Sequence, residues 1–237
     1  MWKSLKALFS NDLGNLDNMI VDFQKMLALS KEMTIMVTDC VFQDKDLEDI
    51  RNEFYKKDRH INKLEQQIRK EVVTYLSVQV GQNLSSCLVL LSVVHDAERL
   101  GDLAKNIFDI FSRVKRPESK ELEELSLEIR NKIINWISLI SEAFAEGNHE
   151  KVEKFVRDSF IVEKQCEDIS NKLITDNSGV NYGAYVLLFR FYKRMLCHMN
   201  NIASSIIMPL DKLGYHTTPE KAASDASKYD QQGEYLP

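Results

Sequence analysis

Glycine and proline are scarce in this chain, with 8 and 4 copies among 237 residues. That is about 5% of the residues, where ordinary proteins have roughly 12%. β-Sandwiches and β-barrels need many turns, so this composition argues against them. Few turns also mean long elements. Because 44% of the residues are hydrophobic, the chain can fill a core, and its length allows one large domain or two small ones. We therefore predict an all-α fold.

Long apolar runs and basic runs are also absent. No stretch approaches 18 uncharged apolar residues, which excludes a transmembrane helix of ordinary length. The first ten residues, MWKSLKALFS, have no continuous apolar core, so we expect no secretory signal. The net charge is −5 and no five like charges stand in a row. Both features argue against a nucleic-acid-binding protein.

Closely spaced cysteines and catalytic motifs are missing as well. The four cysteines (Cys40, Cys87, Cys166 and Cys197) are far apart, and none belongs to a CxxC pair. We interpret them as reduced core residues of a cytoplasmic protein. The sequence has no phosphate-binding loop, dinucleotide fingerprint, nucleophile elbow or zinc-protease motif. We therefore predict that the protein is not an enzyme.

What is present is helical periodicity in six segments of about 30 residues. Apolar residues recur at three-and-four spacing between polar or glycine-containing breaks, and short loops imply antiparallel neighbours. Pro117 divides the helices three and three. The prediction is two tandem antiparallel three-helix bundles packed side by side. Its parts are a short amphipathic segment (1–13), a first repeat (14–116), a second repeat (117–214) and a mobile polar tail (215–237).

One helix face carries the most informative pattern. Glu98, Asp102 and Asn106 are spaced at i, i+4 and i+8, which stacks them on one face. Gly101 lies inside the same predicted helix, at a cost of roughly 1 kcal/mol relative to alanine. Helices tolerate such a glycine where another group must come close. Two carboxylates one turn apart can bind a cation, but a solvated acidic stripe has the same spacing, so both interpretations stay open.

The string Glu-Arg-Leu-Gly-Asp-x-Ala-x-Asn-Ile at residues 98–107 resembles the signature of the PhoU family. In that family the signature occurs once per three-helix repeat. The second half holds a weaker copy, 95 residues later. It keeps the motif residues Arg194, His198, Asn201, Ile202 and Ala203, but has Lys193 and Cys197 in place of the two acids. The first copy has Leu103 in place of the histidine. The resemblance covers roughly residues 14–213 and agrees with the two-repeat plan.

The resemblance also implies acidic pairs on the middle helix of each repeat. The matching positions are Asp58 in the first half, and Glu163 and Glu167 in the second. Some PhoU proteins bind iron or zinc clusters through such motifs. The implied ligands are therefore Glu98, Asp102, Asn106, Asp58, Glu163 and Glu167. Iron and zinc are the implied metals, magnesium, calcium and manganese are not excluded by carboxylate ligands, and a metal-free protein is equally compatible. Lys193 either neutralises neighbouring carboxylates or points to solvent.

The function implied by the resemblance is regulation of phosphate transport or phosphate-starvation signalling in bacteria. The expected partners are a phosphate transporter, a symporter or a sensor histidine kinase, with membrane association through the partner and a homodimer as a further expectation. The alternative is a metal-free helical adaptor that kept the fold and lost the site. A metalloenzyme would need an open coordination position and a general base, and the sequence indicates neither.

Overall fold

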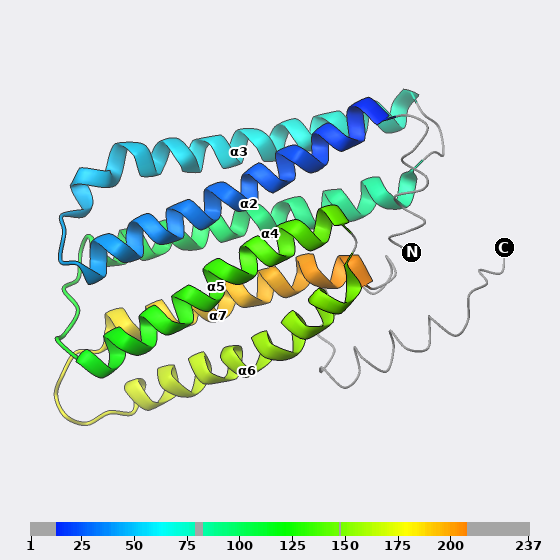
Figure 1. Cartoon of the computed structure of the whole chain (residues 1–237). Coiled ribbons are helices and arrows are strands. Elements are labelled where there is room, and N and C mark those ends of the chain that lie inside the picture. The colour runs from blue at the N-terminus through cyan, green and yellow to red at the C-terminus, as the bar shows by residue number, and fades with distance from the viewer. Residues whose placement is uncertain (1–12, 79–82, 147, 208–237) are drawn as a thin grey trace.

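Six long helices make up the computed structural model, which describes residues 13–78, 83–146 and 148–207. They are α2 (Leu13–Phe42), α3 (Leu47–Val78), α4 (Leu84–Phe111), α5 (Lys120–Glu146), α6 (His149–Ile174) and α7 (Gly183–Ile207) (Figure 1). No strand occurs in these ranges. The predicted all-α fold is confirmed. The predicted amphipathic N-terminal segment, apart from its last residue, and the polar tail lie outside the described residues.

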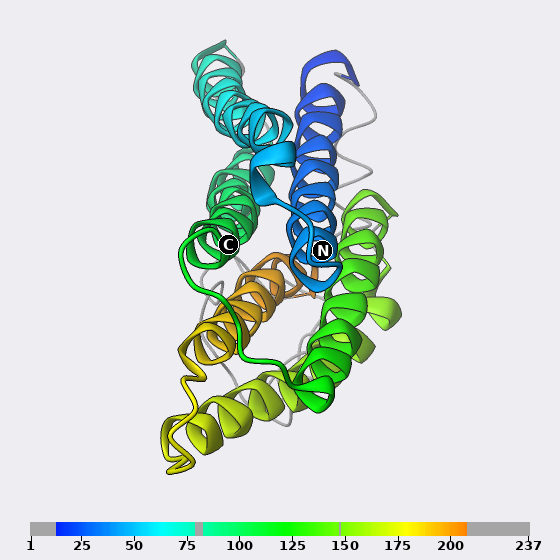
Figure 2. The ribbon, with the colours of Figure 1, turned by 90° about the vertical axis from the view of Figure 1, so that its left-hand side faces the viewer.

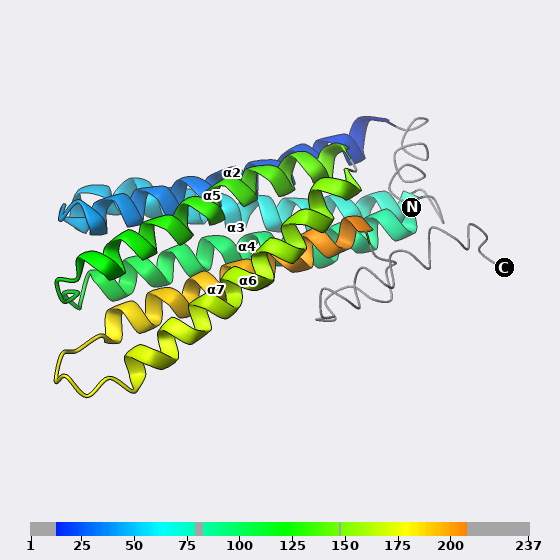
Figure 3. The same cartoon turned by 60° about the horizontal axis from the view of Figure 1, so that its bottom comes forward.

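The helices form two groups of three that lie against each other. Helices α2, α3 and α4 all contact one another, as do α5, α6 and α7, and the pairs α4–α7 and α2–α5 join the groups. The end-on view shows α3 and α6 at opposite outer sides, with the other four helices between them (Figure 2). All six run roughly along one direction of the molecule (Figure 3). This arrangement confirms two three-helix bundles packed side by side, and Pro117 lies in the connection between α4 and α5.

The first helix begins at Leu13, one residue before the predicted start of the first repeat, so that Gly14 and Asn15 lie in its first turn. The first-turn N–H groups of a helix have no intrahelical acceptor. Residues that compete with helical hydrogen bonds, such as asparagine, are therefore tolerated at a helix start. The two residues begin the helix and do not interrupt it.

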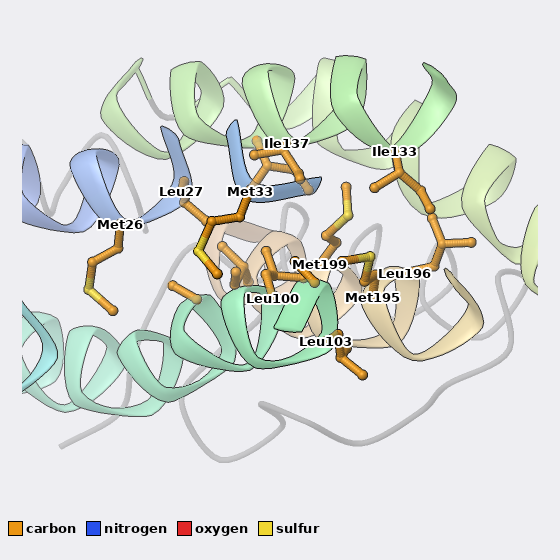
Figure 4. Packing of buried hydrophobic residues seen from close by; sticks show 14 of the residues in the cluster. Met26, Leu27, Met33, Leu100, Leu103, Ile133, Ile137, Met195, Leu196 and Met199 are labelled. Atoms are coloured by element: carbon orange, nitrogen blue, oxygen red, sulfur yellow. The ribbon is translucent and has the colours of Figure 1, made fainter. Parts of the chain in front are cut away.

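The apolar core is continuous between the two bundles. Figure 4 shows side chains of α2, α4, α5 and α7 meeting in one cluster. Met33, Leu100, Ile137 and Leu196 come from these four helices and are at most 1% exposed. Burial of side chains of this size contributes about 1.5–3 kcal/mol each. The two repeats therefore share a core, and this holds α4 and α7 in a fixed relation.

Gly101 permits the close approach predicted for it. A Cβ atom built there would lie 2.8 Å from Cδ1 of Ile61 on α3 and 3.6 Å from Oγ of Ser30 on α2. Ser30 also donates a hydrogen bond to the Ala97 carbonyl of α4 (3.3 Å). The glycine thus lets α3 pack tightly on α4, beside the acidic residues that both helices carry.

No helix among the described residues is long and apolar enough to span a membrane.

Candidate functional site

The first acidic cluster lies between α3 and α4. We use this name for Asp58, Glu65, Glu98 and Asp102. The structure thus brings together three predicted ligands, Asp58, Glu98 and Asp102, on facing helices. Asp58 is 8% exposed, and the side chains of Glu98 and Asp102 are 13% and 25% exposed. Asn106 is half-buried one turn further along α4, and its side chain makes no hydrogen bond to a described residue.

A lysine of the chain lies inside this cluster. Nζ of Lys105 is 3.5 Å from Oδ1 of Asp58 and 3.5 Å from Oδ1 of Asp102. Burial lowers the pKa of Lys105, but the two carboxylates raise it more, so that the net pKa lies above its ordinary value. Arg99 adds a second cation, with Nη1 2.7 Å from Oδ2 of Asp102. Asp58 and Asp102 are therefore neutralised by side chains.

Glu98 has a strongly raised pKa. Burial raises the pKa of Glu98 to about 7, and the negative charges of Asp102 and Glu65 add to this, while Arg99 opposes it. Its Oε2 atom is buried and accepts no hydrogen bond from the described residues. Buried carboxylates without donors ordinarily take up a proton or a cation.

Two members of the site were missed by the sequence interpretation. Glu65 of α3 and His95 of α4 converge on Glu98, with potential ligand atoms of all three residues within 4.8 Å of one another. A signal for them exists in the sequence. Glu65 follows Asp58 by seven residues and His95 precedes Glu98 by three, so both lie on the same helix faces as the predicted ligands.

The second acidic cluster lies between α6 and α7, and consists of Glu163 and Glu167. Glu163 is 8% exposed and accepts hydrogen bonds from Nδ2 of Asn200 and, at 3.4 Å, from Sγ of Cys197. Glu167 is 43% exposed, with Nζ of Lys193 3.3 Å from its Oε2 atom. Of the two orientations open for Lys193, the structure shows the one that neutralises a carboxylate.

The two clusters occupy equivalent positions in the repeats. Lys105 contacts Asp58, and Asn200, which lies 95 residues later, contacts Glu163. Asp58 and Glu163 hold the same place in the acidic motifs of the two middle helices. The thiol in place of Asp102 is protonated at neutral pH, because burial and then the charge of Glu163 raise the pKa of Cys197 to about 12. All four cysteines are free, and three are buried.

The other motif residues of the second copy join the two repeats. Nδ1 of His198 lies 2.8 Å from Oδ1 of Asp96, and Nδ2 of Asn201 donates to the same oxygen at 2.9 Å. Asp96 belongs to α4 and its partners belong to α7. The histidine and asparagine of the second motif therefore hold the repeats together, and do not face the acidic cluster of their own half.

A pocket of about 740 Å³ opens away from both clusters, between the α2–α3 turn and the α4–α5 connection. Basic residues line it, among them Lys45, Lys115 and Arg116. Arg116 is already paired with Glu123 and, at 3.2 Å, with Asp44. Since its most buried cation is neutralised, the pocket has little to attract an anion, and we do not assign a function to it.

Lysines of the chain lie beside predicted metal ligands in both halves. In the first half Lys105 lies between two of the predicted ligands, and in the second half Lys193 lies at the more exposed carboxylate. A cationic side chain beside a carboxylate repels a metal ion and competes for the carboxylate oxygens. The predicted acids of the two halves lie on separate helix pairs, α3 with α4 and α6 with α7.

Comparison with known proteins points to one family. Residues 23–111 match the model of the PhoU domain. Over 211 residues the chain is 22% identical to a Clostridium acetobutylicum protein named "Phosphate-specific transport system accessory protein PhoU homolog", an alignment that covers 85% of this chain and 94% of that one. No solved structure matches. The matched domain ends with α4, in agreement with the stronger motif in the first half. Together with the two-repeat helical fold, these matches support the resemblance to the PhoU family that the sequence motif indicated.

Proposed function

We propose that this protein is an accessory regulator of phosphate transport or phosphate-starvation signalling that acts by protein–protein contact. The observation that carries the proposal is the similarity to the PhoU homolog, which extends over 85% of this chain and so includes both repeats. The matched PhoU domain supports the same conclusion for the first half.

The fold suits a contact role. Six helices of 25–32 residues present long exposed faces along which another protein can dock. The partner in the proposal is a phosphate transporter, a symporter or a sensor histidine kinase, and the protein reaches the membrane surface through that partner. Binding of the bundle damps the partner's activity, and no bond of a substrate is broken in this mechanism.

The test is deletion of the gene in its source organism, followed by measurement of radioactive phosphate uptake at high and low external phosphate. We expect uptake at high phosphate to rise in the deletion strain, because the brake on the transport system is lost. Reintroduction of the wild-type gene restores the original rate, and an empty vector does not. Equal uptake in the deletion and parental strains at both phosphate levels would contradict the proposal.

A second candidate is a helical adaptor that functions without metal at the predicted positions. The observation in its favour is that Lys105 and Lys193 neutralise acids of the two clusters. This candidate differs from the first in its partner, which need not belong to phosphate transport. The deletion experiment separates the two, since an adaptor of another system leaves phosphate uptake unchanged.

A further inference from the structure

The outward face of α3 carries a row of basic side chains. We call it the basic stripe, and it consists of Lys56, Arg59, Lys63 and Lys70, which are all exposed. We propose that this stripe binds directly to the surface of a membrane that contains anionic lipids. The inference goes beyond the proposed function, in which the protein reaches the membrane through a partner, and it can be tested in the absence of that partner.

The spacing of the four residues places them along one side of the helix. Arg59, Lys63 and Lys70 follow Lys56 by 3, 7 and 14 residues, and these intervals are close to whole turns of an α-helix. At 1.5 Å per residue the stripe is about 21 Å long. Helix α3 lies at an outer side of the molecule (Figure 2). A flat surface can therefore contact all four side chains at once.

The acids in the same stretch of α3 point toward the bundle. Asp58 is 8% exposed and pairs with Lys105 of α4. The side chain of Glu65 is 12% exposed and pairs with Arg69. None of the four cations of the stripe forms an ion pair with a carboxylate in the part of the chain that the structure describes. The charges of α3 are thus separated, with acids on the inner side and unpaired cations on the outer side.

The nearest other acids of α3 lie beyond the ends of the stripe. Glu53 precedes it and shares Lys57 with Glu32 of α2. Glu71 follows it and accepts a hydrogen bond from Gln67. Between Lys56 and Lys70 the exposed residues of α3 are basic side chains and glutamines. An approaching anionic surface therefore meets no carboxylate along this length.

The charge of the whole chain makes the stripe a means of orientation. The net charge is −5, so the rest of the molecule is more acidic than the whole and is repelled by an anionic membrane. Clusters of four or more lysines and arginines on a helix are attracted to anionic lipid head groups. Attraction at the stripe and repulsion elsewhere would place α3 against the lipid and leave the other helices free to contact a protein.

Exposed apolar residues at the end of α3 favour a lipid surface over an acidic protein face. Val73 and Val78 follow Lys70 by three and eight residues, and they are 61% and 72% exposed. Helices that lie in the membrane interface combine basic side chains with apolar ones that enter the boundary between head groups and acyl chains. An acidic protein face would account for the cations alone.

The test is co-sedimentation of full-length protein with phosphatidylcholine vesicles that contain about one-third phosphatidylglycerol, at low ionic strength. We expect binding to these vesicles and none to vesicles of phosphatidylcholine alone. Because each basic residue near an anionic surface contributes about fivefold, Lys56→Gln/Lys63→Gln should lower the partition coefficient about 25-fold. The Debye length falls to about 3 Å in 1 M salt, so this salt concentration should release the wild type.

The matched control is Lys151→Gln/Lys164→Gln on α6, the other outer helix. It removes the same charge, but from lysines that pair with acids, and should bind nearly as the wild type does. Equal losses in the two double variants would show that net charge alone governs binding, and would overturn the proposal. No binding by the wild type, or wild-type binding by the α3 variant, would do the same. Binding of the wild type to a polyglutamate peptide but not to vesicles would assign the stripe to an acidic protein face and also overturn the proposal.

Discussion

The two acidic clusters occupy equivalent positions in the repeats, yet they neutralise their carboxylates differently. In the first half Lys105 lies between Asp58 and Asp102, and a third carboxylate, Glu98, stays buried with a raised pKa. In the second half the position of Glu98 is taken by Lys193, which pairs with Glu167. The difference shows how one helical plan can keep a buried carboxylate with a raised pKa in one repeat while the other repeat has a lysine at the equivalent position.

The largest expected effect concerns the residue beside each cluster, which is Gly101 in α4 and Leu196 in α7. Leu196 is fully buried, so Leu196→Ala should lower the free energy of unfolding by about 3 kcal/mol through lost burial and a cavity. Gly101→Ala adds a methyl group 2.8 Å from Cδ1 of Ile61, the end of a side chain that can shift, and 3.6 Å from Oγ of Ser30, and its gain in helix propensity offsets this crowding in part. Its effect should stay below about 1 kcal/mol. Urea unfolding followed by circular dichroism measures both, and equal losses would show that the repeats pack alike.

The next effect is a gain of stability when Glu98 is replaced by glutamine. The pKa of Glu98 rises from its ordinary 4.5 to about 7 on folding, so the folded state binds the proton more tightly. The stability that Glu98 contributes in the wild type is therefore fully present below pH 4.5 and is lost as the pH rises through about 7. Glu98→Gln removes this loss, and should stabilise the protein by about 2 kcal/mol at pH 8.

Measurement at two pH values checks this explanation. Urea unfolding of wild type and Glu98→Gln should show a clearly smaller difference at pH 5 than at pH 8. Glu167→Gln, at an exposed carboxylate of the second cluster, should show little difference at either pH. A gain for Glu98→Gln that is the same at both pH values would mean that ionisation of Glu98 is not its cause.

The bridge between the repeats gives a smaller effect. Asp96→Ala removes the shared acceptor of His198 and Asn201. Buried donors without partners cost about 1–3 kcal/mol, and we expect a loss near 1.5 kcal/mol in thermal or urea unfolding. Leu103, which takes the place of the motif histidine in the first half, is buried at 2% exposure and offers no corresponding polar bridge. If Asp96→Ala unfolds at the wild-type midpoint, the polar bridge does not stabilise the contact of α4 with α7.

The smallest effects are expected from replacing Lys105 and Lys193, the lysines of the two clusters. Lys105→Met leaves the buried Asp58 without its cation and should cost about 1 kcal/mol at pH 7. Lys193→Met breaks an ion pair whose two side chains, Lys193 and Glu167, are 35% and 43% exposed. Such pairs contribute 0–1 kcal/mol, and we expect a change within about 0.5 kcal/mol. Chemical unfolding at low and high salt should show the larger effect for Lys105, and the reverse order would contradict the assigned burial.

Much of the fold could be predicted from the sequence, because long amphipathic helices have apolar residues at a recognisable three-and-four spacing. The six predicted segments of about 30 residues correspond to six helices of 25–32 residues. The close approach at Gly101 was also predicted and is confirmed. Gly14 and Asn15 interrupt a helix interior but are accepted in a first turn, which is where α2 has them.

The site could be predicted only in part. Spacing along one helix placed Glu98 and Asp102 together, and the family resemblance added Asp58. Neither shows how α3 is aligned against α4, and it is this alignment that brings Glu65 to His95 and Lys105 to Asp58. Contacts between helices depend on packing of the whole bundle, which a single helix pattern does not contain. The predicted ligand roles of these residues, and of Asn106, Glu163 and Glu167, remain predictions.

The most direct test of the comparison between the repeats is a titration of the Glu98 carboxyl, followed by NMR of the intact chain with ¹³C-labelled glutamate and assigned with Glu98→Gln. The account predicts a midpoint at about pH 7, because this carboxyl is buried beside Asp102 and Glu65. A midpoint near the ordinary 4.5 would contradict the account.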